Sequence, residues 1–470
     1  MRRLLVLLSL AVCLPASALA QSELPNGGYE KAYTIAADAA WLGSGRVLSP
    51  AFVRIENGAI AWVRSTPPSA KKSGGLFGMG GSTPSKPIRV QGTLAPGLVD
   101  AWSRLLPERE MESRNHPAWL DVLDSLPEDF AGEDLALSGR IAAARQAGIA
   151  AAYVSFASGP MQRGQGTAVV FSTNDLPLPA GRVAYEIVGA SMHSSSSGAS
   201  LSAGKIRELF TEAQDWRDSW DEYDEKVEKY DKAVEEYPGK IEEWAKERDD
   251  YKAKIDDGIT KDDKGKDLKE PKQPKSPKRP RQPRLDPAQK PIFDAIDGRV
   301  QVRFEVQTAD EIAVVLELTE QFDLDSVLVS ARDADLLAAA IADADVPVIL
   351  ACLPEMGEQS AMLSQPQAQY PPRSFTQRYM ALTAAGVDVA LGSGASDGVQ
   401  ALMLMRAGEL IAAGADADGV WASLTSIPAR ILGLDPALGR IGSGASASMI
   451  RFEGDSPFDA SAAVRAHKPR

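Results

Sequence analysis

The chain has 470 residues, a formal net charge of −13 and two cysteines. This acidic balance suits a soluble protein and disfavours nucleic acid as a default partner. The length allows a large core and more than one domain. Cys13 lies in an N-terminal segment that we expect to be removed, so the mature chain keeps only Cys352 and has no intrachain disulfide. We expect Cys352 to be a buried thiol at the end of a strand.

Residues 1–20 have the pattern of a secretory signal peptide. Two arginines precede the apolar run 4–14, and Ala18-Leu19-Ala20 forms a small-residue cleavage site. Cys13 raises the alternative of a lipoprotein, but Val12 before it fits a lipobox poorly. We therefore expect an exported protein, periplasmic or extracellular. The apolar run is too short to span a membrane, and the sequence has no other candidate transmembrane segment.

Residues 31–66 read as short strands separated by turns. Two apolar-rich runs, 53–56 and 59–63, flank Asn57-Gly58, a strong signal for a β-hairpin. Residues 67–87 are rich in Ser, Gly, Pro and Lys and predict an exposed loop. The strand pattern returns at 88–94.

From Leu94 onward, short apolar runs alternate with amphipathic helical stretches. This alternation favours a parallel α/β architecture, with a closed barrel preferred over an open sheet. The sequence has no Gly-rich phosphate loop or dinucleotide fingerprint, which weakens the open-sheet alternative. The predicted strands are 98–99, 150–156, 168–171, 300–306, 326–329, 346–350 and 387–391, and the predicted helices are 133–147, 309–322, 334–344 and 377–385.

Residues 203–290 interrupt this alternation with a helical and charged insertion. Apolar and aromatic residues recur every three or four positions from Leu209 to Tyr237 and again from Ile241 to Ile255. The spacing predicts two helices joined at Pro238-Gly239. The aromatic stripe is either an assembly surface or the face that packs the insertion onto its own domain or itself.

Pro-Lys and Pro-Arg pairs repeat through residues 264–284. This composition predicts an extended, mobile linker. Its basic charge could attract an acidic partner or an anionic surface; the alternative is a solvated linker beside an acidic helix.

Several motifs resemble those of metal-dependent amidohydrolases. Residues 96–105, Pro-Gly-Leu-Val-Asp-Ala-Trp-Ser-Arg-Leu, resemble the opening barrel strand of that superfamily, Pro-Gly-Leu-Ile-Asp-Ala-His-Thr-His-Leu. Further segments resemble the imidazolonepropionase-like branch in the same order: 162–169, 302–312, 385–393, 427–434 and 438–444. The resemblance implies a distorted (β/α)8 TIM barrel over residues 96–436, which contains the insertion. It also implies a small composite β-sandwich built from both chain ends, 28–95 and 437–470.

The residues inside these motifs depart from the pattern of the family. In the family, histidines of the opening strand hold a catalytic metal, usually zinc, but tryptophan offers only an N–H donor and arginine stays protonated. We therefore expect no metal here. The positions that depart from the usual ligands or proton shuttle are Trp102, Arg104, Glu305, Gln307, Ser330 and Gly394.

Other groups could still support chemistry. Asp100, Glu305 and Asp397 are expected near the mouth of the barrel, where two carboxylates can hold Mg²⁺ or Ca²⁺ or act as general acid and base. The alternative is a structural ion pair with Arg104. The three histidines, His116, His193 and His467, fall outside the ligand strands and are expected at the surface. No Gly-x-Ser-x-Gly elbow supports a serine nucleophile.

The sequence therefore predicts an exported amidohydrolase-like protein that has lost metal-dependent C–N hydrolysis. Its expected role is to bind a small-molecule ligand, or an active paralogous amidohydrolase subunit; a homo-oligomer is also open. One alternative is a C–N bond hydrolase with an atypical carboxylate site. Another is a structural or interaction protein that uses the helical insertion.

Overall fold

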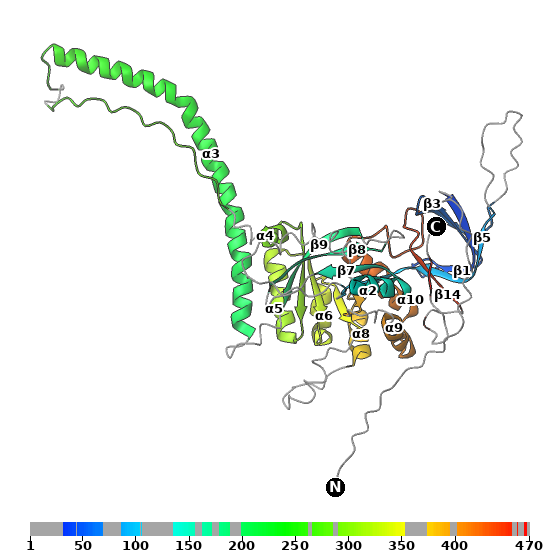
Figure 1. The fold of residues 1–470 in the computed structure, drawn as a ribbon. Helices are drawn as coiled ribbons and strands as arrows, with labels where there is room; N and C mark the ends of the chain where they lie inside the picture. Colours follow the sequence, from blue (N-terminus) through cyan, green and yellow to red (C-terminus); the bar gives the residue numbers. More distant parts are fainter. Residues whose placement is uncertain are drawn as a thin grey trace, which may run out of the picture.

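The computed structural model describes residues 32–43, 45–68, 86–103, 105, 135–155, 162–171, 178–188, 199–261, 266–284, 290–352, 374–394, 402–453, 458 and 465–467. Over these ranges the chain is mixed α/β, with one seven-stranded sheet, one eight-stranded sheet and helices that cover the larger sheet (Figure 1). A single long helix projects away from this body.

The seven-stranded sheet joins the two ends of the chain. Its order is β15-β14-β5-β1-β3-β4, with β2 paired to β1. The strands are Ala32–Trp41 (β1), Val47–Leu48 (β2), Ala51–Glu56 (β3), Ala59–Arg64 (β4), Ile88–Pro96 (β5), Met449–Phe452 (β14) and Arg465–His467 (β15). The predicted hairpin is confirmed: β3 and β4 pair antiparallel, and Asn57 and Gly58 between them have φ values of 51° and 80°.

The eight-stranded sheet has the order β13-β12-β11-β10-β9-β8-β7-β6. Its strands are Leu98–Asp100 (β6), Ile149–Ser155 (β7), Gln162–Val170 (β8), Leu178–Val188 (β9), Gln301–Val306 (β10), Ser326–Ser330 (β11), Val348–Ala351 (β12) and Val389–Gly392 (β13). The expectation of a wholly parallel sheet is wrong at one strand, because β8 runs antiparallel to both β7 and β9. The connections 156–161 and 171–177 are too short for the crossover that parallel neighbours need.

Helices pack against one face of the eight-stranded sheet. They are Leu135–Gln146 (α2), Lys290–Ile296 (α4), Ala309–Phe322 (α5), Ala334–Leu337 (η4), Ala338–Asp343 (α6), Phe375–Ala384 (α8), Leu402–Ala412 (α9) and Ala417–Leu424 (α10). Ser426–Ile431 (α11) lies against the opposite face, where Ile431 clusters with Val327 and Ile349. Capping boxes begin α5 at Thr308 and α8 at Ser374. Alternate strand residues such as Leu328, Leu350 and Leu391 bury themselves against these helices.

The other face of the sheet is concave, because its two edges come together. The N–H of Gly394 donates to the carbonyl of Trp102 at 2.9 Å, and the N–H of Ala101 donates to the carbonyl of Leu391 at 3.4 Å. These bonds link the chain just after β6 to β13 at the opposite end of the strand order. Arg303 of β10 also reaches β7, with its guanidinium carbon 3.7 Å from the centroid of the Tyr153 ring.

The insertion forms one helix of 58 residues, Ala199–Asp256 (α3), rather than the two that were predicted. Pro238 lies inside it, and the helix continues past this residue. Ideal geometry gives a length of about 87 Å. Its first turns pack on the body: the rings of Phe210 and Phe322 lie 5.5 Å apart and those of Trp216 and Phe293 4.3 Å apart. This part of the stripe therefore packs the insertion onto its own domain.

Residues 266–284, which we call the proline strand, are extended as predicted, but they pack along α3 rather than forming a free linker. The proline strand returns along α3 (Figure 1) and is held there by side chains of the helix. Trp244 Nε1 donates to the carbonyl of Pro271 at 3.0 Å, and the hydroxyl of Tyr237 donates to that of Pro274 at 3.5 Å. The distal aromatic stripe thus packs the insertion onto itself.

Every third residue of the proline strand is partly buried, and the residues between are exposed. The partly buried residues are Leu268, Pro271, Pro274, Pro277, Pro280 and Pro283. Three residues per turn is the period of the polyproline II helix, in which residues i and i+3 lie on the same edge. One edge of this helix, made almost wholly of proline, therefore faces α3.

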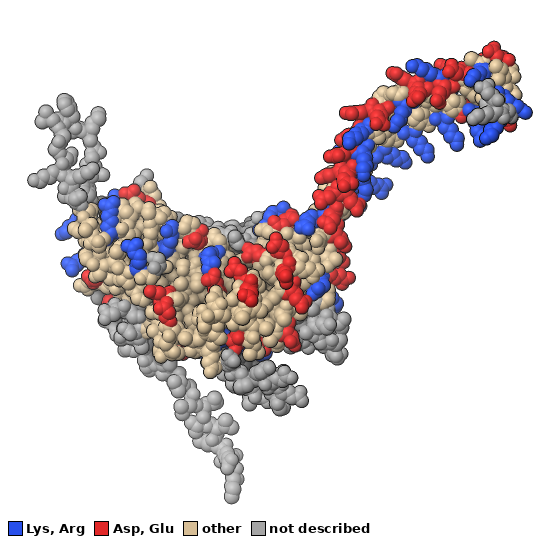
Figure 2. All heavy atoms as spheres, turned by 180° about the vertical axis from the view of Figure 1, so that it is seen from behind, with Lys and Arg blue, Asp and Glu red and all other residues tan. Residues whose placement is uncertain are grey.

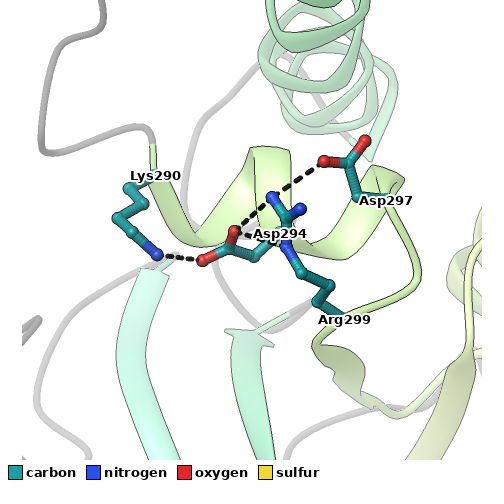
Figure 3. A network of polar contacts seen from close by, with 4 residues as sticks. All are labelled: Lys290, Asp294, Asp297 and Arg299. Atoms are coloured by element: carbon teal, nitrogen blue, oxygen red, sulfur yellow. Dashed lines mark hydrogen bonds and ion pairs between the residues drawn. The ribbon is translucent and has the colours of Figure 1, made fainter.

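A polar cluster fixes the point where the chain returns from the insertion to the body (Figure 3). Asp294 of α4 accepts from Lys290 at 2.5 Å and from Arg299 at 2.8 Å, and Arg299 also pairs with Asp297 at 2.8 Å. The backbone N–H groups of Arg299 and Val300 donate to the carbonyl of Asp294. These bonds set the turn that leads into β10 and its inward-facing residues.

We predict that Trp244→Ala releases the proline strand from α3, because the substitution removes the indole that donates a hydrogen bond to the carbonyl of Pro271. Limited digestion with trypsin, which cuts after Lys and Arg, should then cleave within 266–284 several times faster than in the wild type. Gln273→Ala, at an exposed position of the same strand, is the matched control and should digest like the wild type. Equal cleavage rates for Trp244→Ala and the wild type would contradict the packing described here.

Candidate functional site

Asp100, at the end of β6, is fully buried and lies where the two edges of the eight-stranded sheet meet. Its Oδ1 accepts from the backbone N–H of Ser393 at 2.8 Å and from that of Trp102 at 3.2 Å, and its Oδ2 accepts from the Ser393 hydroxyl at 2.5 Å. Both carboxylate oxygens are therefore engaged by neighbouring backbone and side chain. This geometry gives Asp100 a clear structural role in joining β6 to the chain after β13.

Burial raises the pKa of Asp100 to about 6, because desolvation penalises the charged carboxylate. The hydrogen bonds from Ser393 and Trp102 and the positive charge of Arg303 oppose this rise. A carboxyl with this pKa changes protonation state near neutral pH, as catalytic carboxyls do. In Asp100, however, this pKa belongs to a carboxyl whose two oxygens are both hydrogen-bonded within the fold.

Arg303 places a guanidinium group on the concave face of the sheet. It is 1% exposed; its Nη2 donates to the carbonyl of Ala101 at 2.6 Å, and its plane lies over the ring of Tyr153. A delocalised arginine cation can stack on an aromatic face, which offsets part of the cost of burial. The strand alternates, so Val302, Phe304 and Val306 face the helices while Arg303 and Glu305 share the opposite face.

Trp102 is the first of the positions at which the sequence is expected to depart from the ligand pattern. Its side chain is 7% exposed and belongs to an apolar cluster with Val327, Val329 and Ile349. A Cβ at Gly392 would lie 2.8 Å from the Trp102 Cβ, and Gly394 adopts a φ of 63° beside the indole ring. These two glycines therefore make room for the tryptophan.

Two more of the predicted positions lie together. Gln307 Nε2 donates to the Ser330 hydroxyl at 2.9 Å, which links the chain after β10 to the end of β11. Ser330 and Ala331 have φ values of 69° and 34°, in the left-handed region that costs free energy for residues with a Cβ. Glu305 is half-buried on the concave face of β10. The structure thus brings together Trp102 with Gly394, and Gln307 with Ser330.

Arg104, Asp397, His116 and His193 lie outside the described residues, so their predicted roles remain predictions. The backbone of His467 pairs with that of Met449 in the seven-stranded sheet. Cys352 is buried at the end of β12, as predicted, and burial raises the pKa of its thiol above the usual range. A buried thiol of this kind is a poor nucleophile.

The described groups on the concave face do not offer the donors that a catalytic zinc ion needs. Within the described ranges, no three His, Cys, Asp or Glu side chains form a group that could hold a metal ion. Zinc needs deprotonated nitrogen, sulfur or oxygen donors. The indole of Trp102 supplies none, and the fixed positive charge of Arg303 beside Asp100 would repel a cation.

Arg303, Tyr153 and Ser393 were not predicted as site residues. The alternation of apolar and polar residues through Val302–Gln307 could have placed Arg303 on the inner face, because every second side chain of a strand in a curved sheet faces inward. The contacts of Tyr153 and Ser393 with this group come from strands distant in sequence. No local pattern marks them.

Comparison with solved structures identifies the fold. An amidohydrolase from Thermotoga maritima MSB8 matches with a TM-score of 0.60 and 18% identity, over 93% of this chain and 97% of that chain. Ochratoxinase from A. niger gives 0.49 and 15%, over 91% of each chain. A zinc-bound adenosine deaminase from Xanthomonas campestris gives 0.41 and 15%, over 90% of this chain and 84% of that one. No family profile and no curated protein sequence matches. The chain shares the fold of the T. maritima amidohydrolase.

We predict that ionisation of Asp100 lowers the free energy of unfolding as the pH rises from about 4 to about 6. Its pKa is about 6 in the folded protein and near 4 when unfolded, so the folded state binds the proton more tightly. The stabilisation is complete below about pH 4 and is lost as pH rises to about 6, a change of about 3 kcal/mol. Asp100→Asn has no such proton to lose.

The test compares the melting temperatures of Asp100→Asn and the wild type at pH 4 and at pH 7. Relative to the wild type, the variant should melt at a higher temperature at pH 7 than it does at pH 4. Ser393→Ala serves as a second variant: it removes a hydrogen bond to the charged carboxylate, so the fall should extend to higher pH. Parallel pH profiles for the wild type and Asp100→Asn would show that this carboxyl does not control the transition.

Proposed function

We propose that this chain is an exported, amidohydrolase-like protein that has lost metal-dependent C–N hydrolysis and acts by binding. The supporting observation is the buried Arg303 guanidinium on the concave face, next to Asp100 and above Tyr153. A cation fixed in this place opposes the divalent ion on which hydrolysis by this superfamily depends. Its partner is a small-molecule ligand or an active paralogous subunit.

The proposal includes the finer architecture that the sequence predicts. The backbone bonds between β13 and the chain after β6 support closure of the eight-stranded sheet into a distorted barrel. The reach of Arg303 from β10 to β7 supports the same closure, since it crosses the concave interior. The seven-stranded sheet, which both chain ends build, corresponds to the proposed composite sandwich.

The rival proposal is a C–N bond hydrolase that uses Asp100, Glu305 and Asp397. The engagement of both Asp100 oxygens by Ser393 and Trp102 argues against a role for Asp100 as a base or an ion ligand. A base needs an accessible lone pair that can reach its substrate. This rival would have to rest on Glu305 and Asp397.

A third proposal, an interaction protein that uses the insertion, gains support from the order of that insertion. A chain pays a large entropic cost to hold an extended segment against a long helix, so an ordered projection of this length favours a role outside the body. Among the described helices, none is long and apolar enough to cross a membrane.

We predict that the protein, purified without chelators, contains zinc, iron and manganese only in substoichiometric amounts. Added zinc should leave its melting temperature unchanged, because an ion that binds the folded state would raise it. Elemental analysis and thermal melting make these measurements. One equivalent of tightly held metal per chain, or a clear rise in melting temperature on adding zinc, would overturn the proposed loss of hydrolysis.

A further inference from the structure

The polyproline period of the proline strand sorts its residues onto three edges. The proline edge packs on α3. The residue after each proline lies on a second edge, and every one of them is basic: Lys272, Lys275, Lys278, Arg281 and Arg284. The third edge carries one charge, Arg279, among Gln273, Ser276 and Gln282. We call the second edge the basic ridge.

The cations of the basic ridge are exposed and are not paired within the described chain. Three lysines of α3 differ in this respect: Lys226, Lys229 and Lys240 each pair with a glutamate one helical turn earlier, at 2.9, 3.4 and 2.8 Å. Polyproline geometry places successive ridge charges about 9 Å apart on a line about 37 Å long. This spacing exceeds the Debye length of about 8 Å at physiological salt, so the five cations repel one another weakly.

The position of the ridge separates it from the negative charge of the rest of the molecule. α3 and the proline strand carry most of it away from the body (Figure 1). Figure 2 shows blue side chains along one edge of this projection and red side chains along the other. The whole chain has a net charge of −13, so it would be repelled by an anionic surface in most orientations. This edge of the projection presents a line of exposed positive charge.

We propose that the basic ridge docks the protein onto an anionic lipid surface. The ridge is an open line of exposed cations along the projection, so an extended anionic surface can meet it, whereas an open line of side chains cannot enclose a small molecule. Basic residues near an anionic bilayer each add to the binding free energy. A second copy is a poorer fit, because a two-fold contact centred on the ridge would place the cations of the two copies opposite one another.

An acidic polypeptide is the other partner that the charge would allow. It would have to order its own backbone along the ridge, and the ridge offers exposed lysine and arginine tips with no apolar residue between them to anchor it. The lipid surface meets the same charges without this cost. This proposal does not depend on the loss of hydrolysis. It names an anionic lipid surface as the partner with which the insertion would interact.

The experiment is co-sedimentation of the mature protein with vesicles of phosphatidylcholine containing roughly 30% phosphatidylglycerol, at about 20 mM and about 150 mM salt. The wild type should bind these vesicles, more weakly at the higher salt, and should not bind vesicles of phosphatidylcholine alone. Replacing all five ridge residues with glutamine should weaken binding at least about 100-fold.

The matched control replaces five exposed lysines of α3 with glutamine: Lys226, Lys229, Lys232, Lys240 and Lys246. It changes the net charge by the same amount and should bind like the wild type. Circular dichroism at 222 nm checks that both variants keep the long helix. Equal losses in the two variants, or binding to uncharged vesicles, would overturn the proposal. The proposal would also fail if poly-glutamate displaced the protein from vesicles at a far lower concentration of charge than that of the lipid. That result would assign the ridge to an acidic polypeptide.

Discussion

The hydrogen bonds between Asp100 and Ser393 hold together the two edges of the eight-stranded sheet. They join a residue near the start of the sheet to one near its end, 293 positions apart in sequence. The concave face exists because these edges meet. Trp102 and Arg303, which occupy that face, each contact the chain around this junction. A single buried carboxylate therefore organises both the shape of the sheet and the contents of its interior.

The groups of that interior pair with or pack against one another. Gln307 donates a hydrogen bond to Ser330, and Trp102 packs against Gly392. An empty polar cavity would cost free energy, and a lone buried charge would cost more. The paired and packed groups described here avoid both costs.

The sequence predicts those strands and helices of the body whose hydrophobic periods are regular: 309–322 is predicted as a helix and α5 has these bounds. It misses β9 and the helices α4, α9 and α10. It also misses the antiparallel direction of β8, which depends on loop length and pairing rather than on the composition of the strand. It also missed the contacts of Arg303, because the ring of Tyr153 comes from another strand. The packing of the proline strand was missed for a similar reason: its composition suggests a chain without a core, and its order comes from aromatic residues of α3.

The packing of the proline strand on α3 brings together an α-helix and a polyproline helix, which have different repeats. The contacts of Trp244 with Pro271 and of Tyr237 with Pro274 are seven residues apart on the helix and three apart on the strand. Seven helical residues rise about 10.5 Å and three polyproline residues about 9.3 Å, so the two periods nearly match. The projection can therefore gain or lose length in steps of one heptad and one proline triplet while every side chain keeps its face. Its reach is a property that insertions and deletions can alter without any change to the body.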